Sequence, residues 1–375
     1  MQQALTLAPE LRLHQISQAR RAVLGEGRSL DGALSASWIE RSWQRCLARG
    51  QQPEEDLAFE VISVHASRRS EEAHSGLVQA ARPVLEKLGR AIADTRYFAI
   101  LTNAQGVVVD VSGPIDRSDR RAALITRIGT NLSEPSIGTS AIGAALAELQ
   151  PVWLHRGEHF FSSTSVYSCA GAPLFGPDGR CVGMLDLTGI EAAERPELKH
   201  LAAQSARRIE NALLLGQPHS LMVRLNWPGH TLGFDADGLV CLDTDGWVLG
   251  ANQIARQMVS QLTTPEHAAV HVSDVFGMPY QLLFDAARRQ NPVIEVPLWS
   301  GLRLSALPTA HADATRGVDA GAGFRTNENV PLKDMETALI RKAVDAARGN
   351  VAQAARQLGI SRATVYRKLG HGKHL

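Results

Sequence analysis

The spacing of hydrophobic residues along the chain predicts two amphipathic helices that bracket a strand-rich region. Hydrophobic residues recur at three- and four-residue steps in residues 70–93 and again in residues 195–215, which is typical of a buried helix face. Between them, residues 97–113 hold two β-rich runs around an Asn-Ala-Gln-Gly turn, and residues 151–189 hold two apolar runs around Pro-Asp-Gly. Hairpins flanked by helices predict one α+β domain over residues 70–215.

A second strand-and-helix unit is predicted over residues 221–307. Residues 238–258 read as a strand, an Asp-Gly turn, a second strand and a helix, and residues 292–307 supply two more strands. Residues 308–330 are rich in Ala, Gly, Thr and Asp and show little periodicity, which predicts a flexible linker. Residues 1–69 are polar and helical in pattern. We therefore expect a helical lead-in followed by two α+β domains and a linker.

Residues 331–375 have the pattern of a helix-turn-helix. The hydrophobic residues of 332–347 share one helix face, and Asn350 is placed to cap the next helix. Gly359 can take the left-handed turn conformation after that second helix, and Ser361 is placed to cap a third. An alanine pair in the second helix allows the third helix to cross it closely. This combination predicts a compact three-helix DNA-binding domain.

Charge supports DNA binding only at this end of the chain. The whole chain has a net charge of +1, so no overall field directs it to nucleic acid or to a membrane. Residues 351–375 contain five basic residues and no acidic one. The third helix is expected to place Arg362, Thr364, Arg367 and Lys368 on its outward face, where Arg can read guanine edges and Lys can hold phosphates. The alternative is a basic, solvated helix hairpin that does not bind DNA.

Composition indicates an ordinary globular chain in a reducing compartment. Hydrophobic residues make up 44% and charged residues 21% of its 375 residues, and its four cysteines lie far apart without a CxxC pair. No apolar run approaches about 18 residues, and the N-terminus does not read as a signal peptide. We expect a cytoplasmic protein that does not interact with membranes.

Several segments resemble known bacterial regulators. "GNVAQAARQLGISRATVYRKL" (349–369) resembles the Fis-type helix-turn-helix that ends many enhancer-binding regulators. "SEPSIGTSAIGAALAELQPVWLHRGEHFF" (133–161) and "YSCAGAPLFGPDGRCVGMLDLTG" (167–189) resemble the GAF sensor domain of acetoin-catabolism and dihydroxyacetone-kinase-operon activators. "ERSWQRC" (40–46) resembles the lead-in of that group, and "LVCLDTDGWVLGANQIARQM" (239–258) is similar to the start of a PAS domain.

The resemblance implies a fold class and a set of DNA contacts. It implies an α+β multidomain protein with a GAF-like sensor domain, a PAS-like α+β domain and a C-terminal all-α Fis-type helix-turn-helix. Ser361, Arg362, Thr364 and Arg367 would face double-stranded DNA, with Tyr366 nearer the backbone. The chain departs from the group at two places: it has Gly-Thr-Ser at 138–140 where Gly-Thr-Asn is usual, and Tyr167 where tryptophan is common.

A larger departure concerns ATP. Those activators carry an AAA+ ATPase between sensor and DNA-binding parts, but nothing in this sequence matches the GxxxxGK[ST] phosphate loop. Without backbone amides and a lysine to hold ATP phosphates, we expect regulation without ATP hydrolysis. The protein would contact another form of RNA polymerase, block a promoter or modulate another regulator.

The sensor half supplies candidates for a small-molecule site. Aromatic and polar side chains that can cover an apolar ligand and fix its hydroxyl or carbonyl cluster on the segment that resembles the sensor pocket wall. They are Trp153, His155, His159, Phe160, Tyr167 and Cys169. The effector expected from the resemblance is a small alcohol, ketone or aldehyde. The alternative for each residue is plain core packing.

Two rival functions remain open from the sequence. One is a metal-dependent sensor or enzyme built on His155, Glu158 and His159; the other is a ligand-blind DNA-binding adaptor. No G-x-S-x-G elbow and no haem or flavin signature is present, so we expect neither enzyme activity nor a cofactor nor a bound metal. A single helix-turn-helix makes few DNA contacts, which favours a homodimer. The apolar stripe of residues 195–215 is a candidate dimer seam or packs on its own sheet.

Overall fold

The computed structural model describes residues 2–28, 37–62, 64–263, 269–289 and 292–310, together with six positions nearer the C-terminus. Those six are Val344, Val351, Gln353, Ala355, Arg362 and Val365. The chain divides into two compact units, Met1–Thr315 and Arg316–Leu375, and the first unit contains two sheets. None of the helices in the described ranges is long and apolar enough to cross a membrane.

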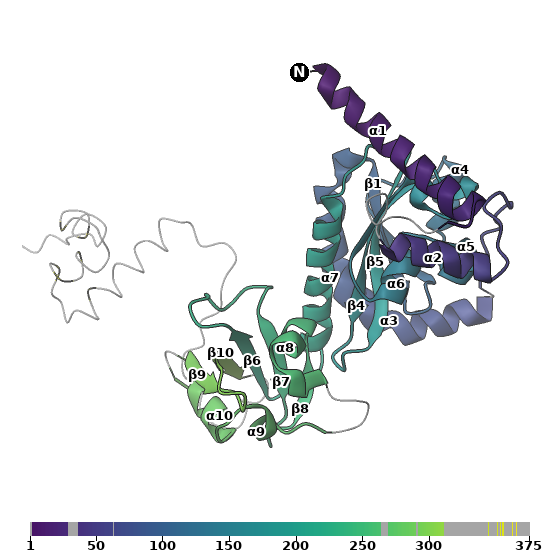
Figure 1. The fold of residues 1–375 in the computed structure, drawn as a ribbon. Coiled ribbons are helices and arrows are strands. Elements are labelled where there is room, and N and C mark those ends of the chain that lie inside the picture. Colours follow the sequence, from purple (N-terminus) through teal and green to yellow (C-terminus); the bar gives the residue numbers. More distant parts are fainter. Residues whose placement is uncertain are drawn as a thin grey trace, which may run out of the picture. The chain divides into compact units, whose positions relative to one another are not determined.

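The first sheet is antiparallel, with the strand order β2-β1-β5-β4-β3 (Figure 1). Its strands are β1 (Tyr97–Asn103), β2 (Val108–Ser112), β3 (Val152–His155), β4 (Tyr167–Phe175) and β5 (Cys181–Ile190). Both predicted hairpins are confirmed: β1 pairs with β2 around the Asn-Ala-Gln-Gly turn, and β4 pairs with β5 around Pro-Asp-Gly. Gly179 has a φ of 85°, which a glycine adopts without strain.

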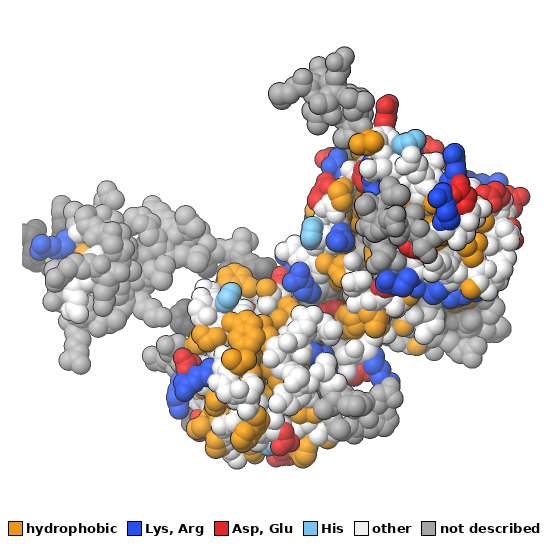
Figure 2. Space-filling model, viewed as in Figure 1, with side chains coloured by type: hydrophobic (Ala, Val, Ile, Leu, Met, Phe, Trp, Pro, Cys, Tyr) orange, Lys and Arg blue, Asp and Glu red, His pale blue; other side chains and the backbone are white. Residues whose placement is uncertain are grey.

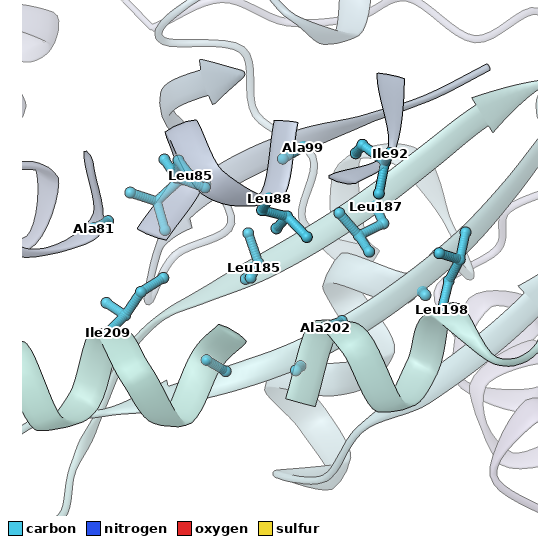
Figure 3. Packing of buried hydrophobic residues seen from close by; sticks show 14 of the residues in the cluster. Ala81, Leu85, Leu88, Ile92, Ala99, Leu185, Leu187, Leu198, Ala202 and Ile209 are labelled. Atoms are coloured by element: carbon cyan, nitrogen blue, oxygen red, sulfur yellow. The ribbon is translucent and has the colours of Figure 1, made fainter. Parts of the chain in front are cut away.

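Helices cover both faces of this sheet. On one face lie α3 (Val64–Ala91) and α7 (Leu198–Leu215), and their apolar stripes pack on β1, β4 and β5 (Figure 3). Figure 3 shows Leu85 and Leu88 of α3 and Ala202 and Ile209 of α7 directed at Leu185 of β5. The stripe of α7 is therefore buried against its own sheet. On the other face lie α4 (Arg120–Ile125), α5 (Glu134–Ile137) and α6 (Ala141–Glu148), around a second hydrophobic cluster.

The N-terminal helices also pack on this domain. Helix α1 (Gln2–Arg20) continues into a π-helical turn, Arg21–Gly25, and α2 (Ser37–Ala48) follows. Their buried residues form one hydrophobic cluster with Phe160 and Phe161. The cluster consists of Ala19, Val23, Ile39, Trp43, Cys46, Phe160 and Phe161.

The second sheet has the order β8-β7-β6-β10-β9. Its strands are β6 (Leu221–Asn226), β7 (Gly238–Leu242), β8 (Val248–Ala251), β9 (Ile294–Pro297) and β10 (Arg303–Ala310). Short helices pack on one face: α8 (Gln253–Met258), α9 (Val272–Val275) and α10 (Gln281–Ala287). The sequence pattern did not predict β6, which pairs with both β7 and β10 and so occupies the centre of the sheet.

Polar residues of the second domain form turns and cap a helix. The Asp243 carboxylate accepts hydrogen bonds from the amides of Asp245 and Trp247, and Asn252 caps α8 by accepting from Ala255 N. Figure 2 shows hydrophobic side chains gathered on the visible face of this domain. Its exposed large hydrophobic side chains include Trp227, Phe234, Trp247, Trp299 and Leu302.

The described residues of the C-terminal unit agree with the expected inward and outward faces. All six are helical; Ala355 and Val365 are buried, with Val344 and Val351 packed against them, and Arg362 is exposed. The other predicted DNA contacts, Ser361, Thr364, Tyr366, Arg367 and Lys368, lie outside the described residues.

Candidate ligand site in the first domain

Strand register decides which of the predicted ligand contacts can meet. Successive residues of a strand face opposite sides of the sheet, and directly paired residues share a side. Leu154 of β3 pairs with Cys169 of β4, whereas Trp153 pairs with Ala170 and His155 pairs with Ser168. Leu154 and Cys169 belong to the core beside α4–α6, and Ala170 belongs to the core beside α3 and α7. Trp153 and His155 therefore face away from Tyr167 and Cys169.

A small buried cavity lies on the side that carries Tyr167 and Cys169. Its volume is about 30 Å³, and it is enclosed by the sheet, by α4–α6 and by the segment that follows β3. Hydrophobic residues such as Ile100, Ile125 and Ile142 form much of the wall. The polar or sulfur-bearing side chains in the wall are Ser140, His159, Thr164, Tyr167, Cys169, Asp186 and Thr188. Three of the six predicted contacts, His159, Tyr167 and Cys169, thus meet here.

His159 presents an imidazole nitrogen without a partner. Its Nδ1 lies 2.9 Å from the carbonyl oxygen of Arg156, so Nδ1–H donates that bond and Nε2 is left as an acceptor. Nε2 is buried and has no hydrogen-bond partner within the described structure. Burial lowers the pKa of His159 to about 4, which keeps the ring neutral at pH 7. His159, a residue of the cavity wall, therefore carries a buried acceptor that no described group uses.

Asp186 contributes a second polar atom without a partner. It lies on β5, opposite Ile100 and Gly171, and its side chain is almost fully buried. Oδ2 accepts a hydrogen bond from the Thr188 hydroxyl, while Oδ1 is buried without a partner among the described residues. Burial raises the pKa of Asp186 to about 7, so the carboxyl is close to half protonated at neutral pH. In its protonated form it can donate a hydrogen bond into the cavity.

The remaining polar groups of the wall are held by the protein. Tyr167 donates its hydroxyl proton to the Arg121 carbonyl oxygen at 3.2 Å, and burial raises the pKa of this phenol. Ser140 caps α6 by accepting from Gly143 N at 3.1 Å. The Cys169 sulfur lies 3.4 Å from the Thr188 hydroxyl, and burial raises the pKa of this thiol far above its usual value. This thiol therefore stays protonated and acts as a small wall residue.

The other three predicted contacts lie outside the cavity wall. Trp153 stacks near His155 with ring centroids 6.3 Å apart, and His155 Nδ1 lies 2.8 Å from the Ser168 hydroxyl. Burial lowers the pKa of His155 to about 4. Phe160 is fully buried in the cluster that holds the N-terminal helices.

The proposed metal triad is engaged in local structure. Both Glu158 oxygens have partners: Oε1 pairs with Arg12, and Oε2 accepts from the backbone amide of His155 at 2.7 Å. Burial raises the pKa of Glu158 to about 7, against the opposing effect of Arg12. Across the described ranges, no three His, Cys, Asp or Glu side chains gather as a metal site. The pattern His155, Glu158, His159 is that of a capped 3-10 turn.

Sequence reasoning missed Asp186 and Thr188, although a signal was present. In "GMLDLTG" (183–189) these two polar residues alternate with Leu185 and Leu187, inside a strand that is otherwise apolar. Alternation at a period of two places them together on one face. A carboxyl residue inside such a central strand is rarely buried unless it has a structural or functional task.

The motif "SEPSIGTS" (133–140) joins the cavity wall to α2. The buried Glu134 carboxylate accepts hydrogen bonds from Arg45, Arg49 and Ser42 at 2.7–2.9 Å. Burial acts to raise the pKa of Glu134, but these hydrogen bonds outweigh it and lower the pKa overall. A Cβ atom on Gly143 would lie 2.7 Å from the Glu134 side chain, so α6 can approach Glu134 only with glycine there.

These features define a class of protein: an α+β domain with a small cavity whose lining residues include polar ones, joined to a second α+β domain and a C-terminal helical unit. The family profile described as "MimR, N-terminal domain" matches residues 14–211, more than half of the chain. The chain belongs to this family. The profile described as "Bacterial regulatory protein, Fis family" matches residues 331–371, so the C-terminal unit is a Fis-family DNA-binding domain. The expected fold class is confirmed.

Several curated relatives are transcriptional regulators. The acetoin catabolism regulatory protein of Cupriavidus necator is 31% identical over 257 residues, which cover 66% of this chain and 37% of that protein. The acetoin dehydrogenase operon transcriptional activator AcoR of Bacillus subtilis is 30% identical, covering 49% of this chain and 30% of AcoR. The propane 2-monooxygenase operon transcriptional activator MimR of Mycolicibacterium goodii is 30% identical, covering 52% and 33%. The chain thus spans about a third of each relative, and the resemblance to acetoin-catabolism activators is confirmed.

A solved structure also aligns with the chain. The crystal structure of the Escherichia coli DhaR(N)–DhaL complex aligns with a TM-score of 0.46 and 16% identity, over 74% of this chain and 100% of that chain.

Proposed function

We propose that the protein is a ligand-responsive, sequence-specific transcriptional regulator that binds DNA as a homodimer and works without ATP hydrolysis or enzyme activity. One observation supports the ligand-binding part: His159 and Asp186 both line this cavity, and each has a buried polar atom, Nε2 and Oδ1, without a hydrogen-bond partner among the described residues. An unpaired buried polar atom costs about 1–3 kcal/mol, which a ligand supplying the missing hydrogen bonds would recover. The Fis-family domain supports the DNA-binding part.

The wall chemistry favours a small, uncharged, oxygen-bearing effector. A ligand hydroxyl can donate to His159 Nε2, and a ligand carbonyl or hydroxyl oxygen can accept from protonated Asp186. The hydrophobic wall would cover short carbon chains. Alcohols, ketones and aldehydes fit these demands, and acetoin, named in two of the relatives, carries both groups.

Ligand binding is expected to stabilise the protein in a way that depends on His159. A thermal-shift series with acetoin, 2,3-butanediol, butanone and propan-2-ol tests this. At ten times its Kd, a ligand of the folded state raises the free energy of unfolding by about 1.4 kcal/mol. His159→Leu removes the acceptor and is expected to weaken binding about tenfold. His230→Leu makes the same change at an exposed position and is the control.

Equal affinity in His159→Leu and wild type would remove His159 from the contacts. If no member of the series shifts the wild type, the protein is better described as a ligand-blind adaptor.

Arg362→Ala is expected to weaken operator binding by about 1–3 kcal/mol and to relax sequence preference, because Arg362 is exposed on its helix and a bidentate guanine contact is worth that much. Gel-shift titrations against operator and scrambled DNA measure both effects. Lys368→Ala, at a predicted phosphate contact, should instead weaken binding to both DNAs and flatten the dependence on salt. Arg362 would not be a base contact if its variant kept wild-type affinity and selectivity.

A further inference from the structure

We propose that the N-terminal helices α1 and α2 are the read-out element of the cavity: they hold two parts of its wall that lie outside the sheet, so that filling the cavity loosens or shifts these helices. The regulatory role of these helices rests on the proposed ligand site. The link itself is a set of contacts that transmit movement of the cavity wall to α1 and α2. The contacts below carry it.

The first contact is made by Arg20, at the end of α1. Its guanidinium donates to three backbone carbonyl oxygens at and beside His159: that of Gly157 at 3.0 Å, that of His159 itself, and that of Phe160 at 2.9 Å. His159 is the residue whose imidazole lines the cavity. A movement of this residue therefore stretches bonds to α1 directly.

Two further contacts hold the same wall segment. Arg12 of α1 pairs with the buried Glu158 carboxylate, and Trp43 of α2 donates its indole N–H to the Glu158 carbonyl oxygen at 2.9 Å. A Cβ atom on Gly157 would lie 3.1 Å from Ile16 of α1, so this glycine allows the helix to pack closely on the turn. Residues 157–160 are thus bonded to both N-terminal helices through side chains and backbone.

Helix α2 also holds a neighbouring part of the wall, at the start of α6. The Ser42 hydroxyl lies 2.8 Å from the Thr139 hydroxyl and donates to Glu134 at 2.7 Å. Thr139 is adjacent to Ser140, which lines the cavity and caps α6. Movement of the start of α6 is therefore also transmitted to α2.

The size of the cavity makes movement necessary. A volume of 30 Å³ accommodates about two water molecules, so an effector of four or more heavy atoms has to enlarge it. The sheet side is fixed, because β4 and β5 each pair with a strand on both sides. The side formed by residues 157–164 consists of two 3-10 turns outside the sheet. Among the wall segments outside the sheet, the one around His159 and the start of α6 are held by α1 and α2, and the proposal assigns the expansion to these two.

A ligand-free test uses a larger side chain in place of the effector. Cys169→Leu places extra methyl groups in the cavity from β4, and Cys241→Leu makes the same change at a buried position away from the cavity, in the small cluster of β7 with Leu214 at the end of α7. Hydrogen exchange of the full chain is followed by mass spectrometry. Cys169→Leu is expected to speed amide exchange about tenfold or more in residues 10–24 and 38–48, as expected when local opening becomes easier. Residues 73–91 of α3, on the other face of the sheet, should change less than about twofold.

The proposal also predicts that the effect of Cys169→Leu on α1 depends on Arg20. Arg20→Gln weakens the hydrogen bonds to the three carbonyl oxygens, so amide exchange in α1 should already be fast in this variant. Adding Cys169→Leu to Arg20→Gln should then raise the exchange rate in α1 by less than about twofold. If Cys169→Leu fails to fold, Ala141→Val fills the same cavity from α6 and is measured identically.

Unchanged exchange in α1 and α2 in the cavity-filled variant would overturn the proposal, as would an equal increase in α3 or in Cys241→Leu. Because no ligand is used, this result is independent of the effector screen. Failure of the screen removes the ligand site and leaves the mechanical link standing, and the reverse also holds.

Discussion

Trp43→Ala is expected to lower the free energy of unfolding by about 3–5 kcal/mol, the usual cost of truncating a fully buried large aromatic residue. Trp43 has no exposed surface, packs with Phe160 and Phe161, and donates a hydrogen bond to the Glu158 carbonyl. Its loss leaves a cavity and an unpaired backbone oxygen at once. The effect is this large only if α2 folds as part of the sensor domain.

Urea unfolding followed by circular dichroism measures this change, since tryptophan fluorescence itself is altered by the substitution. Trp299→Ala is the matched control, because the Trp299 side chain is 66% exposed and its removal should cost less than about 1 kcal/mol. A loss below about 1 kcal/mol in Trp43→Ala would mean that the N-terminal helices fold separately from the sensor domain.

Short sequence patterns were sufficient to predict the two hairpins and helices α3 and α7. The hairpins around residues 104–106 and 177–179 depend on turn residues that are adjacent in the sequence, and α3 and α7 depend on a period that is visible in one helix. Strand β6 is not followed by the short turn that predicts a tight hairpin with β7. Its position at the centre of the sheet also depends on pairing with β10, about 80 residues later in the sequence.

The site could be predicted only in part, because it depends on register and on distant contacts. The sequence predicts that the segment with aromatic and histidine residues forms a pocket wall, and the structure places three of its residues, His159, Tyr167 and Cys169, around one cavity. One residue of register separates Cys169, in the cavity wall, from Ser168, which pairs with His155. The hydrogen bonds from Arg20 to residues 157–160 join positions 137–140 residues apart in the sequence, and no local sequence pattern predicts them. Asp186 is a lone carboxyl in an apolar strand, and only its alternation with Leu185 and Leu187 indicates that it shares a face with Thr188.

Asp186→Asn is expected to gain stability relative to wild type as the pH rises. The difference in the free energy of unfolding, variant minus wild type, should be more positive at pH 8 than at pH 5. The folded state holds the Asp186 proton up to a pKa of about 7, whereas the unfolded chain releases it near 3.8. Between these values the folded state binds more protons than the unfolded state, so wild type loses stability as pH rises. Asparagine cannot ionise and does not suffer this loss. The difference between the folded and unfolded pKa values of Asp186 corresponds to about 2–4 kcal/mol in the free energy of unfolding. The variant should gain this amount relative to wild type between pH 5 and pH 8.

Urea unfolding of both proteins at pH 5 and pH 8 gives the four free energies needed. Any constant cost of the amide, such as its fit beside Thr188, cancels in the difference between the two pH values. Asp245→Asn, at an exposed turn, controls for the loss of a carboxyl group as such. The same wild-type-to-variant difference at both pH values would show that Asp186 is ionised throughout, and a ligand would then meet a carboxylate in the cavity instead of a hydrogen-bond donor. The pH dependence therefore tests the chemistry of the proposed site without knowledge of its effector.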